Sequence, residues 1–233
     1  MENKGFFTRT YSDLFSVNHN YFSEINTPSK AYWLGFLYAD GCVCGEKVCL
    51  EITDREHVEK FYMAIEAEGY IIRKAYRKRD GRKDSITYSL QVKSPQMVQD
   101  LIKHGCVPKK SLLLKELPDL DSQFLSHFIR GYYDGDGRIS FVASENHYRI
   151  DICGQELFLE KIKKFLGATQ KLRKRKNANV YIWGCSGELK CKKYLDCLYK
   201  DSTEENRLNR KYNLYLDMVK KYYKKIGVKE YGY

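Results

Sequence analysis

The sequence predicts an α+β fold made of two copies of one unit, each with the element order αββαββα. Three observations lead to this prediction. An apolar segment that ends in Asp-Gly occurs twice, at residues 32–41 and 128–137. Short segments that alternate apolar and polar residues follow each copy, which is the period of half-buried strands. Helical segments with capping residues separate these strands, and 233 residues suffice for one large or two modest cores.

The first unit is expected to cover residues 27–106. Residues 1–26 precede it as an extension in which aromatic and polar residues mix without a clear period, and no role is predicted for them. Thr27-Pro28 is typical of a helix start, with a capping residue and a first-turn proline. The expected elements are a helix to Asp40, two strands around Gly45, a helix from Asp54 to Gly69, strands at 72–76 and 86–92, and a helix from Ser94 to Gly105.

The second unit is expected to cover residues 122–233, after a linker at residues 107–121 that contains Pro108 and Pro118. The same order of elements begins again at a cap on Asp121 or Ser122. The expected elements are the second apolar helix, strands at 138–143 and 148–153, a helix at 155–166, strands at 169–175 and 179–185, and a helix at 187–199. Residues 202–205 have the pattern of a capping box and predict one more helix.

Each apolar helix carries two small residues four positions apart. These are Gly35 with Ala39 and Gly131 with Gly135. Residues four apart share one helix face, so each helix can bring its backbone very close to a partner helix. The best partner for each copy is the other copy, and we predict that these four residues form the helix interface.

Parallel packing of the two helices would bring Asp40 and Asp136 together at two helix C-termini. A helix C-terminus is already a negative pole. Two carboxylates ~5 Å apart repel by roughly 3 kcal/mol at an effective dielectric of ~20. We therefore expect a cation between them, and Mg²⁺ suits a site with paired carboxylates.

Two simpler interpretations of these segments carry less weight. A single Asp-Gly after a helix is usually only a turn, but here the pair recurs 96 residues later (136 − 40). Asp134, Asp136 and Gly137 also match part of a calcium-binding loop. That frame would place Tyr132 and Ala143 at two key ligand positions, so it lacks the carboxylates that such a loop needs.

The composition favours a polyanionic partner such as nucleic acid. The formal net charge is +11, and after residue 120 there are 23 Lys and Arg against 14 Asp and Glu, so the second half carries most of the excess. The eight cysteines include no CxxC pair, which favours reduced thiols. Without a long apolar stretch or a signal peptide, we expect no membrane partner and an intracellular protein, cytoplasmic or nucleoid-associated.

The predicted strands supply a surface for reading double-stranded DNA. In residues 86–93 apolar and polar residues alternate, so one face packs on helices while the other stays polar. Arg and Lys can contact guanine edges and phosphates, and Gln can contact adenine. The residues predicted to bind DNA are Arg73, Arg77, Arg79, Ser89, Gln91, Lys93, Arg138, Arg149, Lys171, Arg173 and Arg175. Tyr181 and Trp183 alternate with their neighbours and either reach bases or cover the sheet.

The two segments Trp33–Gly41 and Ile129–Gly137 resemble the nine-residue motif of the LAGLIDADG homing endonucleases. Both copies keep the third, eighth and ninth positions and a small residue at the seventh. They depart at the first two positions, and the first copy has Tyr38 at the sixth in place of an acid. The resemblance extends from about residue 27 onward. It implies a monomer with pseudo-twofold symmetry, whose antiparallel sheets form a saddle over a long asymmetric DNA site.

The resemblance also implies a chemistry. It implies a site-specific double-strand DNA endonuclease of the homing type that uses Mg²⁺, with Mn²⁺ or Ca²⁺ able to substitute in binding. Asp40 and Asp136 would be the catalytic metal ligands, aided by the carbonyl groups of Ala39 and Gly135. The chain ends lack the residues of intein splicing, so we expect a free-standing or intron-encoded enzyme.

The family places a basic catalytic residue late in each half. By position the expected residues are Lys110 and Lys211, with Lys109 and Arg210 as close alternatives. Glu51 and Asp151 occupy matching places on the central strands and are expected to orient water or metal.

The alternative function is a catalytically silent nucleic-acid binder of the same fold, such as an RNA maturase or a transcription regulator. The presence of both Asp40 and Asp136 argues against it, because a binder gains nothing from two carboxylates that repel each other.

Overall fold

The computed structural model describes residues 15–78, 84–107, 116–176 and 178–228. The first unit contains α1 (Pro28–Ala39), β1 (Gly41–Cys44), β2 (Lys47–Ile52), α2 (Arg55–Ala64), β3 (Arg73–Arg77), β4 (Ser85–Lys93) and α3 (Pro95–Lys103). The second contains α4 (Ser122–Asp136), β5 (Gly137–Val142), β6 (His147–Gly154), α5 (Glu156–Leu166), β7 (Arg173–Lys174), β8 (Tyr181–Ser186) and α6 (Glu188–Tyr199), and α7 (Asn209–Lys225) follows. The predicted order of elements is confirmed in both units.

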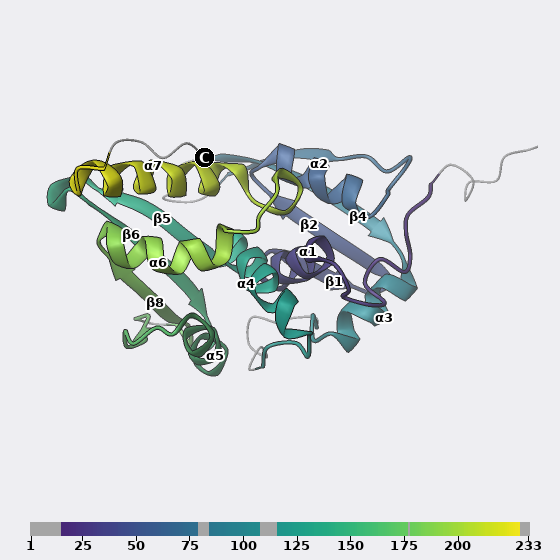
Figure 1. The fold of residues 1–233 in the computed structure, drawn as a ribbon. Helices are drawn as coiled ribbons and strands as arrows, with labels where there is room; N and C mark the ends of the chain where they lie inside the picture. The colour runs from purple at the N-terminus through teal and green to yellow at the C-terminus, as the bar shows by residue number, and fades with distance from the viewer. Residues whose placement is uncertain (1–14, 79–83, 108–115, 177, 229–233) are drawn as a thin grey trace, which may run out of the picture.

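Each unit forms one four-stranded antiparallel sheet. The strand orders are β1-β2-β4-β3 and β5-β6-β8-β7, so the two sheets have the same topology. In Figure 1, α1 and α4 lie at the centre of the molecule, with one sheet on each side. The predicted α+β class with duplicated units is therefore confirmed.

Side-chain caps fix where several helices begin. The Thr27 hydroxyl accepts a hydrogen bond from the backbone N–H of Lys30 at 3.2 Å and starts α1. Asp54 and Ser94 accept in the same way at the starts of α2 and α3, and Asp121 at the start of α4. The capping residues predicted for these four helices are therefore confirmed.

Three element boundaries differ from the prediction. Helix α2 ends at Ala64 rather than at Gly69, because Glu66 adopts a left-handed conformation (φ 53°) that turns the chain. Strand β7 has two residues instead of seven, since only Arg173 and Lys174 pair with β8. The capping box is formed by Thr203 and Asn206 and closes a 3₁₀ turn, so the last helix starts later than predicted, at Asn209.

The contact between α1 and α4 depends on two glycines. A Cβ atom on Gly35 would lie closer than 3.0 Å to the backbone of Phe128, and one on Gly131 would lie as close to the backbone of Tyr32. Real Cβ atoms do not approach backbone atoms so closely. At these two positions the helices can therefore touch only because neither residue has a side chain.

Apolar side chains fill the space between the helices and the inner faces of the sheets. Trp33 and Trp183 are among the largest side chains that are fully buried. Trp183 therefore covers the inner face of its sheet, which settles the alternative that the sequence left open for this residue. Tyr181, two residues earlier, is only partly buried, with Lys174 over its ring.

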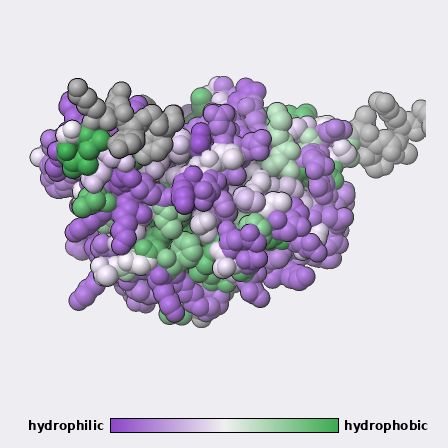
Figure 2. All heavy atoms as spheres, in the orientation of Figure 1, coloured by the Kyte–Doolittle hydropathy of each residue, from purple (hydrophilic) through white to green (hydrophobic). Residues whose placement is uncertain are grey.

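No helix in the described parts of the chain is long and apolar enough to cross a membrane. The face of the molecule drawn in Figure 2 is mostly hydrophilic, and apolar residues gather near its middle.

Candidate active site and nucleic-acid interface

Asp40 and Asp136 lie together where α1 and α4 end. Asp40 caps α1, and its backbone N–H donates to the carbonyl of Phe36 at 2.9 Å. A Cβ atom on Gly135 would lie 3.3 Å from Asp40 Oδ2, so this carboxylate rests against the end of α4. Asp136 is the last residue of α4, and both acidic side chains are exposed. The fold thus joins two acids that are 96 residues apart in sequence.

Lys211 lies beneath these acids and is almost fully buried. Its ammonium group donates to the carbonyls of Tyr133 at 2.8 Å, Asp134 at 2.6 Å and Gly137 at 2.5 Å, with a longer contact of 3.4 Å to Gly135. These carbonyls belong to the last turn of α4 and the residue after it, where a cation is favourable. Lys211 therefore caps the C-terminus of α4, the helix that carries Asp136.

Burial and the neighbouring acids act in opposite directions on the pKa of Lys211. Burial lowers the pKa of Lys211 to about 8, while the charges of Asp134, Asp40 and Asp136 act in the opposite direction. The ammonium group of Lys211 thus lies at the end of α4, within electrostatic reach of both exposed carboxylates.

Asp134, the sixth residue of the second motif, is buried rather than presented to solvent. It accepts hydrogen bonds from the hydroxyls of Tyr32 at 2.9 Å and Tyr199 at 2.5 Å, and from the backbone N–H of Leu208 at 2.8 Å. Burial raises the pKa of Asp134, and the Lys211 charge and these hydrogen bonds act against that shift. The carboxylate joins α1, α6 and the start of α7 below the site.

Arg130 extends this buried polar cluster. Its guanidinium donates to the carbonyl of Leu198 at 2.9 Å, and to the carbonyl and side-chain oxygens of Asn206 at 2.9 and 2.7 Å. It also lies over the ring of Tyr32. The segment between α6 and α7 is thereby tied to α4, which places Lys211 at the start of α7.

A cavity of about 240 Å³ adjoins Asp136. Tyr132, Gln155 and Arg175 are among the residues that line it. The Tyr132 hydroxyl donates to the carbonyl of Cys153 at 2.9 Å, and burial, then the negative charge of Asp136, raise the pKa of Tyr132. Arg175, predicted as a DNA-binding residue, thus reaches the same small space as one of the two acids.

The donor set at the helix ends suits a hard divalent cation. Two exposed carboxylates, and the backbone carbonyls of Ala39 and Gly135 beside them, offer only oxygen. No cluster of three or more His, Cys, Asp or Glu side chains suited to a metal occurs in the portions that the structure describes. Asp40 and Asp136 would therefore share such an ion with backbone oxygens and, when present, with a phosphate.

The outer face of the first sheet carries several of the residues predicted to contact DNA. In β4, Ser89, Gln91 and Lys93 alternate with the buried Leu90 and Val92, so they point away from the helices. This face is polar and open to solvent, as the sequence predicts.

Strand β3 continues the same face. Arg73 pairs with Ser89 in the register. Arg77 donates to the Glu51 carboxylate through Nε at 2.8 Å and Nη2 at 2.7 Å, and the Thr87 hydroxyl also donates to it at 2.8 Å. The hydrogen bonds from Arg77, then that from Thr87, lower the pKa of Glu51. Glu51 therefore orients an arginine of the sheet face.

The second sheet repeats this arrangement. Asp151 pairs with Arg138 in the register and accepts a hydrogen bond from Arg173 at 3.3 Å. Arg149 Nε donates to the hydroxyl of Ser186 at 3.2 Å. The two matching acids thus each hold an arginine, and their expected role in orienting water or metal stays a prediction.

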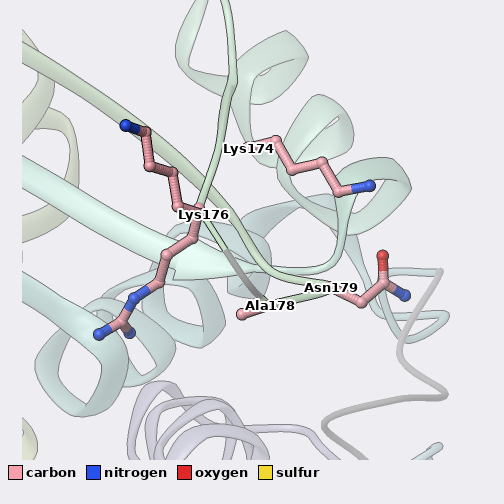
Figure 3. A pocket seen from close by; sticks show the side chains of 5 residues that line it. Lys174, Lys176, Ala178 and Asn179 are labelled. Atoms are coloured by element: carbon pink, nitrogen blue, oxygen red, sulfur yellow. The ribbon is translucent and has the colours of Figure 1, made fainter.

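Basic residues also surround the tip of the β7–β8 hairpin. Lys171 is exposed, but it precedes the short strand instead of lying in it. An open pocket of about 570 Å³ at the tip is lined by Lys174, Arg175, Lys176, Ala178 and Asn179. Figure 3 shows Lys174 and Lys176 extending to opposite sides of the strand. These side chains present positive charge in more than one direction.

Some predicted site residues cannot be placed, and others went unrecognised in the sequence. Arg79, Lys109 and Lys110 lie outside the described residues. Tyr132 and Arg130 were not identified as part of the site. Arg130 stands in the apolar stretch 128–133, and an arginine in such a place indicates a buried polar cluster. The residues that it contacts could not be identified from the sequence.

Comparison with known proteins gives a likeness in structure only. No protein-family model matches the sequence, and no curated protein matches it. The homing endonuclease I-WcaI bound to its DNA recognition sequence is 11% identical, with a TM-score of 0.57 over 84% of this chain and 90% of that chain. The meganuclease I-SmaMI bound to uncleavable DNA is 12% identical, with a TM-score of 0.52 over 83% and 89%.

A third similar structure is not named as an endonuclease. Full-length DUF199/WhiA from Thermatoga maritima is 13% identical, with a TM-score of 0.50 over 97% of this chain and 69% of that chain. I-SmaMI is itself described as a LAGLIDADG homing endonuclease. At these identities a likeness in structure establishes the fold, and this chain therefore has the two-unit LAGLIDADG fold.

Proposed function

We propose that this protein is a site-specific DNA endonuclease that depends on a divalent metal ion and cuts both strands of a long, asymmetric target. One observation carries the proposal. The exposed carboxylates of Asp40 and Asp136 meet at two helix C-termini, between two sheets whose outer faces are basic. Two acids that repel each other are costly at such a place, and a cation bound between them and a phosphate relieves that repulsion.

The ion is expected to be Mg²⁺, which when bound supplies Lewis acidity toward a phosphate and lowers the pKa of water. Asp40 and Asp136 would hold it through their carboxylates, with the carbonyls of Ala39 and Gly135 beside them. Arg175 lines the cavity next to Asp136 and would neutralise a phosphate oxygen there. Lys211 keeps the end of α4 in place.

The two sheet faces would bind the duplex on either side of this centre. Arg77 and Arg173 are each held by an acid of the neighbouring strand, Glu51 and Asp151. A guanidinium held in this way loses less conformational freedom when it contacts a base or a phosphate. The likeness to I-WcaI and I-SmaMI, whose structures contain DNA, supports this use of the sheets.

A catalytically silent nucleic-acid binder is the second candidate. The likeness to DUF199/WhiA, whose name states no nuclease activity, supports it, because the fold alone does not distinguish the two functions. The paired acids favour the endonuclease, since binding to a polyanion is weakened by exposed carboxylates.

The test is cleavage of a randomised duplex DNA library with Mg²⁺. We expect wild-type protein to cut both strands at a rare site. Asp40→Asn and Asp136→Asn should bind the selected duplex but cut little or none of it. Asp119→Asn, which changes an exposed acid outside the site, is the control and should cut like wild type. Binding without cleavage by wild type, with Mg²⁺ or Mn²⁺, would favour the silent binder.

A further inference from the structure

Three cysteines share the outer face of the hairpin formed by β1 and β2. They alternate with buried residues along both strands, and they are Cys42, Cys44 and Cys49. Cys42 and Cys44 are exposed, and Cys49 is partly buried. A free cysteine is usually one of the most buried residues of a protein. Core packing therefore does not explain the two exposed thiols.

Two of these thiols form a directly opposed pair. Cys42 is opposite Cys49 in the antiparallel register. The Cα atoms of such a pair are about 4.5–5.5 Å apart, within the range of about 4.4–6.8 Å that a disulfide spans. Cys44 is opposite Lys47 and therefore diagonal to Cys49, at roughly 7–8 Å, which is too far for a disulfide unless the backbone moves. The backbone thus selects Cys42 and Cys49.

The electrostatics of Cys49 reflect how close the three side chains are. Burial raises the pKa of Cys49, and the charges of Cys42 and Cys44 act in the same direction, while Lys47 acts against them. The Cys49 thiol therefore loses its proton less readily than an ordinary thiol. The exposed Cys42 is the member of the pair that an oxidant would meet first.

The second unit has charged residues where the first has these thiols. Two positions after the motif aspartate, the first unit has Cys42 opposite Cys49, and the second has Arg138 opposite Asp151. The duplicated framework therefore accepts a charged pair at this place and does not require cysteine. The thiol pair is a property of the first unit alone at this register position.

We propose that Cys42 and Cys49 are a redox pair that hydrogen peroxide oxidises to a reversible disulfide. The Cys42 thiolate attacks the peroxide, the O–O bond breaks, and the sulfur keeps one oxygen as a sulfenic acid while the other leaves as water. The Cys49 thiolate then attacks the Cys42 sulfur, so that the S–S bond forms, the S–O bond breaks and a second water leaves. The two electrons lost by the thiols reduce the peroxide to water.

The disulfide has a consequence for the neighbouring acids. It is neutral, and a thiol reductant restores both cysteines. A lone Cys42 would instead be oxidised further to a sulfinate, which is irreversible and would add a negative charge two residues from Asp40. Cys49 thus protects the surface beside the paired acids. The inference goes beyond the proposed function and does not depend on DNA cleavage.

A buried pair of thiols in the second unit provides an internal comparison. The Sγ atoms of Cys185 and Cys191 are 3.7 Å apart, but Cys191 is fully buried and Cys185 is 8% exposed. A peroxide in solution does not reach a sealed thiol, so this pair should stay reduced in the folded protein.

The experiment is treatment of the folded full-length chain with a small excess of hydrogen peroxide, followed by alkylation, digestion and mass spectrometry. In wild type, the peptides that contain Cys42 and Cys49 should be joined by a disulfide, and dithiothreitol should separate them. Cys49→Ser should form no disulfide at Cys42 and should accumulate the sulfinate there. Cys197→Ser, which removes an exposed thiol of α6, is the control and should form the disulfide like wild type.

The possible outcomes separate this inference from the proposed function. Wild-type protein in which Cys42 and Cys49 stay alkylated, or are oxidised singly, would overturn the inference. A disulfide from Cys42 to Cys44, or one between two chains, in place of the internal pair would also overturn it. No DNA is present in this experiment, so a negative result leaves the proposed endonuclease untouched, and a failure to cleave DNA leaves the redox pair untouched.

Discussion

The two units share one framework but support their acids by different means. Both have the same strand order, and each presents an aspartate at the end of a central helix. In the second unit a buried ionic cluster of Asp134, Arg130 and Lys211 lies beneath Asp136. At the position equivalent to Asp134 the first unit has Tyr38, whose hydroxyl donates to the carbonyl of His104.

This difference separates the glycines of the helix contact, which both units have, from the buried charges, which lie beneath Asp136. The glycines at the helix contact are required twice, because the geometry is the same from either side. Among the residues that the structure describes, such a cluster of buried charges lies beneath Asp136 and has no equivalent beneath Asp40. These charges secure α7, which has no counterpart in the described part of the first unit. The comparison can therefore be tested by paired substitutions.

The largest effect is expected where the units are equivalent. Gly35→Ala and Gly131→Ala should each lower the free energy of unfolding by about 4 kcal/mol, since the new Cβ would meet the backbone of the facing helix. Urea unfolding would measure this loss. Gln123→Ala, at an exposed site early in α4, is the control. A marked inequality between the two glycine variants would break the equivalence of the units.

The next largest effect compares the loss of stability on substituting Asp134 with the loss on substituting Tyr38, its equivalent in the first unit. Asp134→Asn places an amide donor among groups that already donate, from Tyr32, Tyr199 and Leu208, and should cost about 3 kcal/mol. The matched variant Tyr38→Phe loses one hydrogen bond and should cost about 1 kcal/mol. Urea unfolding of both variants gives the comparison. Equal losses would mean that the ionic cluster adds nothing to its half.

A smaller effect is expected for Lys211 and distinguishes a structural from a surface lysine. Lys211→Met should lower the free energy of unfolding by about 2 kcal/mol, because it uncaps α4 and removes one of the two cations that interact with the buried Asp134. Its neighbour Arg210 is exposed and forms a 3.5 Å ion pair with Asp54. Arg210→Met should therefore change stability by less than about 0.5 kcal/mol. If Lys211→Met were as stable as wild type, the proposed capping of α4 by Lys211 would be contradicted.

Much of this framework could be predicted from local patterns. The caps at Thr27, Asp54 and Ser94 and the alternation in β4 depend on neighbouring residues, and the structure has them as predicted. The early end of α2 could not be predicted, because the left-handed turn falls on Glu66 and not on a glycine.

Asp40 and Asp136 could be identified from the sequence, but the buried residues that hold the end of α4 could not. Asp40 and Asp136 recur with the same neighbours, which is a pattern that a single sequence shows. The partners of Asp134 come from Tyr32 and Tyr199, far away in the chain, and only tertiary packing brings them together. Lys211 lies among other polar residues, and nothing in the sequence distinguishes it from them. Its burial depends on how α7 packs against α4.

The smallest predicted effect compares His57 in α2 with Phe158, its equivalent in α5, three residues after each cap. His57 donates to the Tyr32 hydroxyl at 3.0 Å, and burial, with the charges of Lys60, Arg210 and Lys211, lowers its pKa well below 6.5. Below about pH 6.5 the unfolded chain binds a proton at His57 that the folded chain does not, so stability falls as pH falls. Between about pH 7.5 and 5.5, wild type should lose about 1 kcal/mol more than His57→Phe in urea unfolding. Parallel pH profiles would show that His57 is not held neutral by the fold.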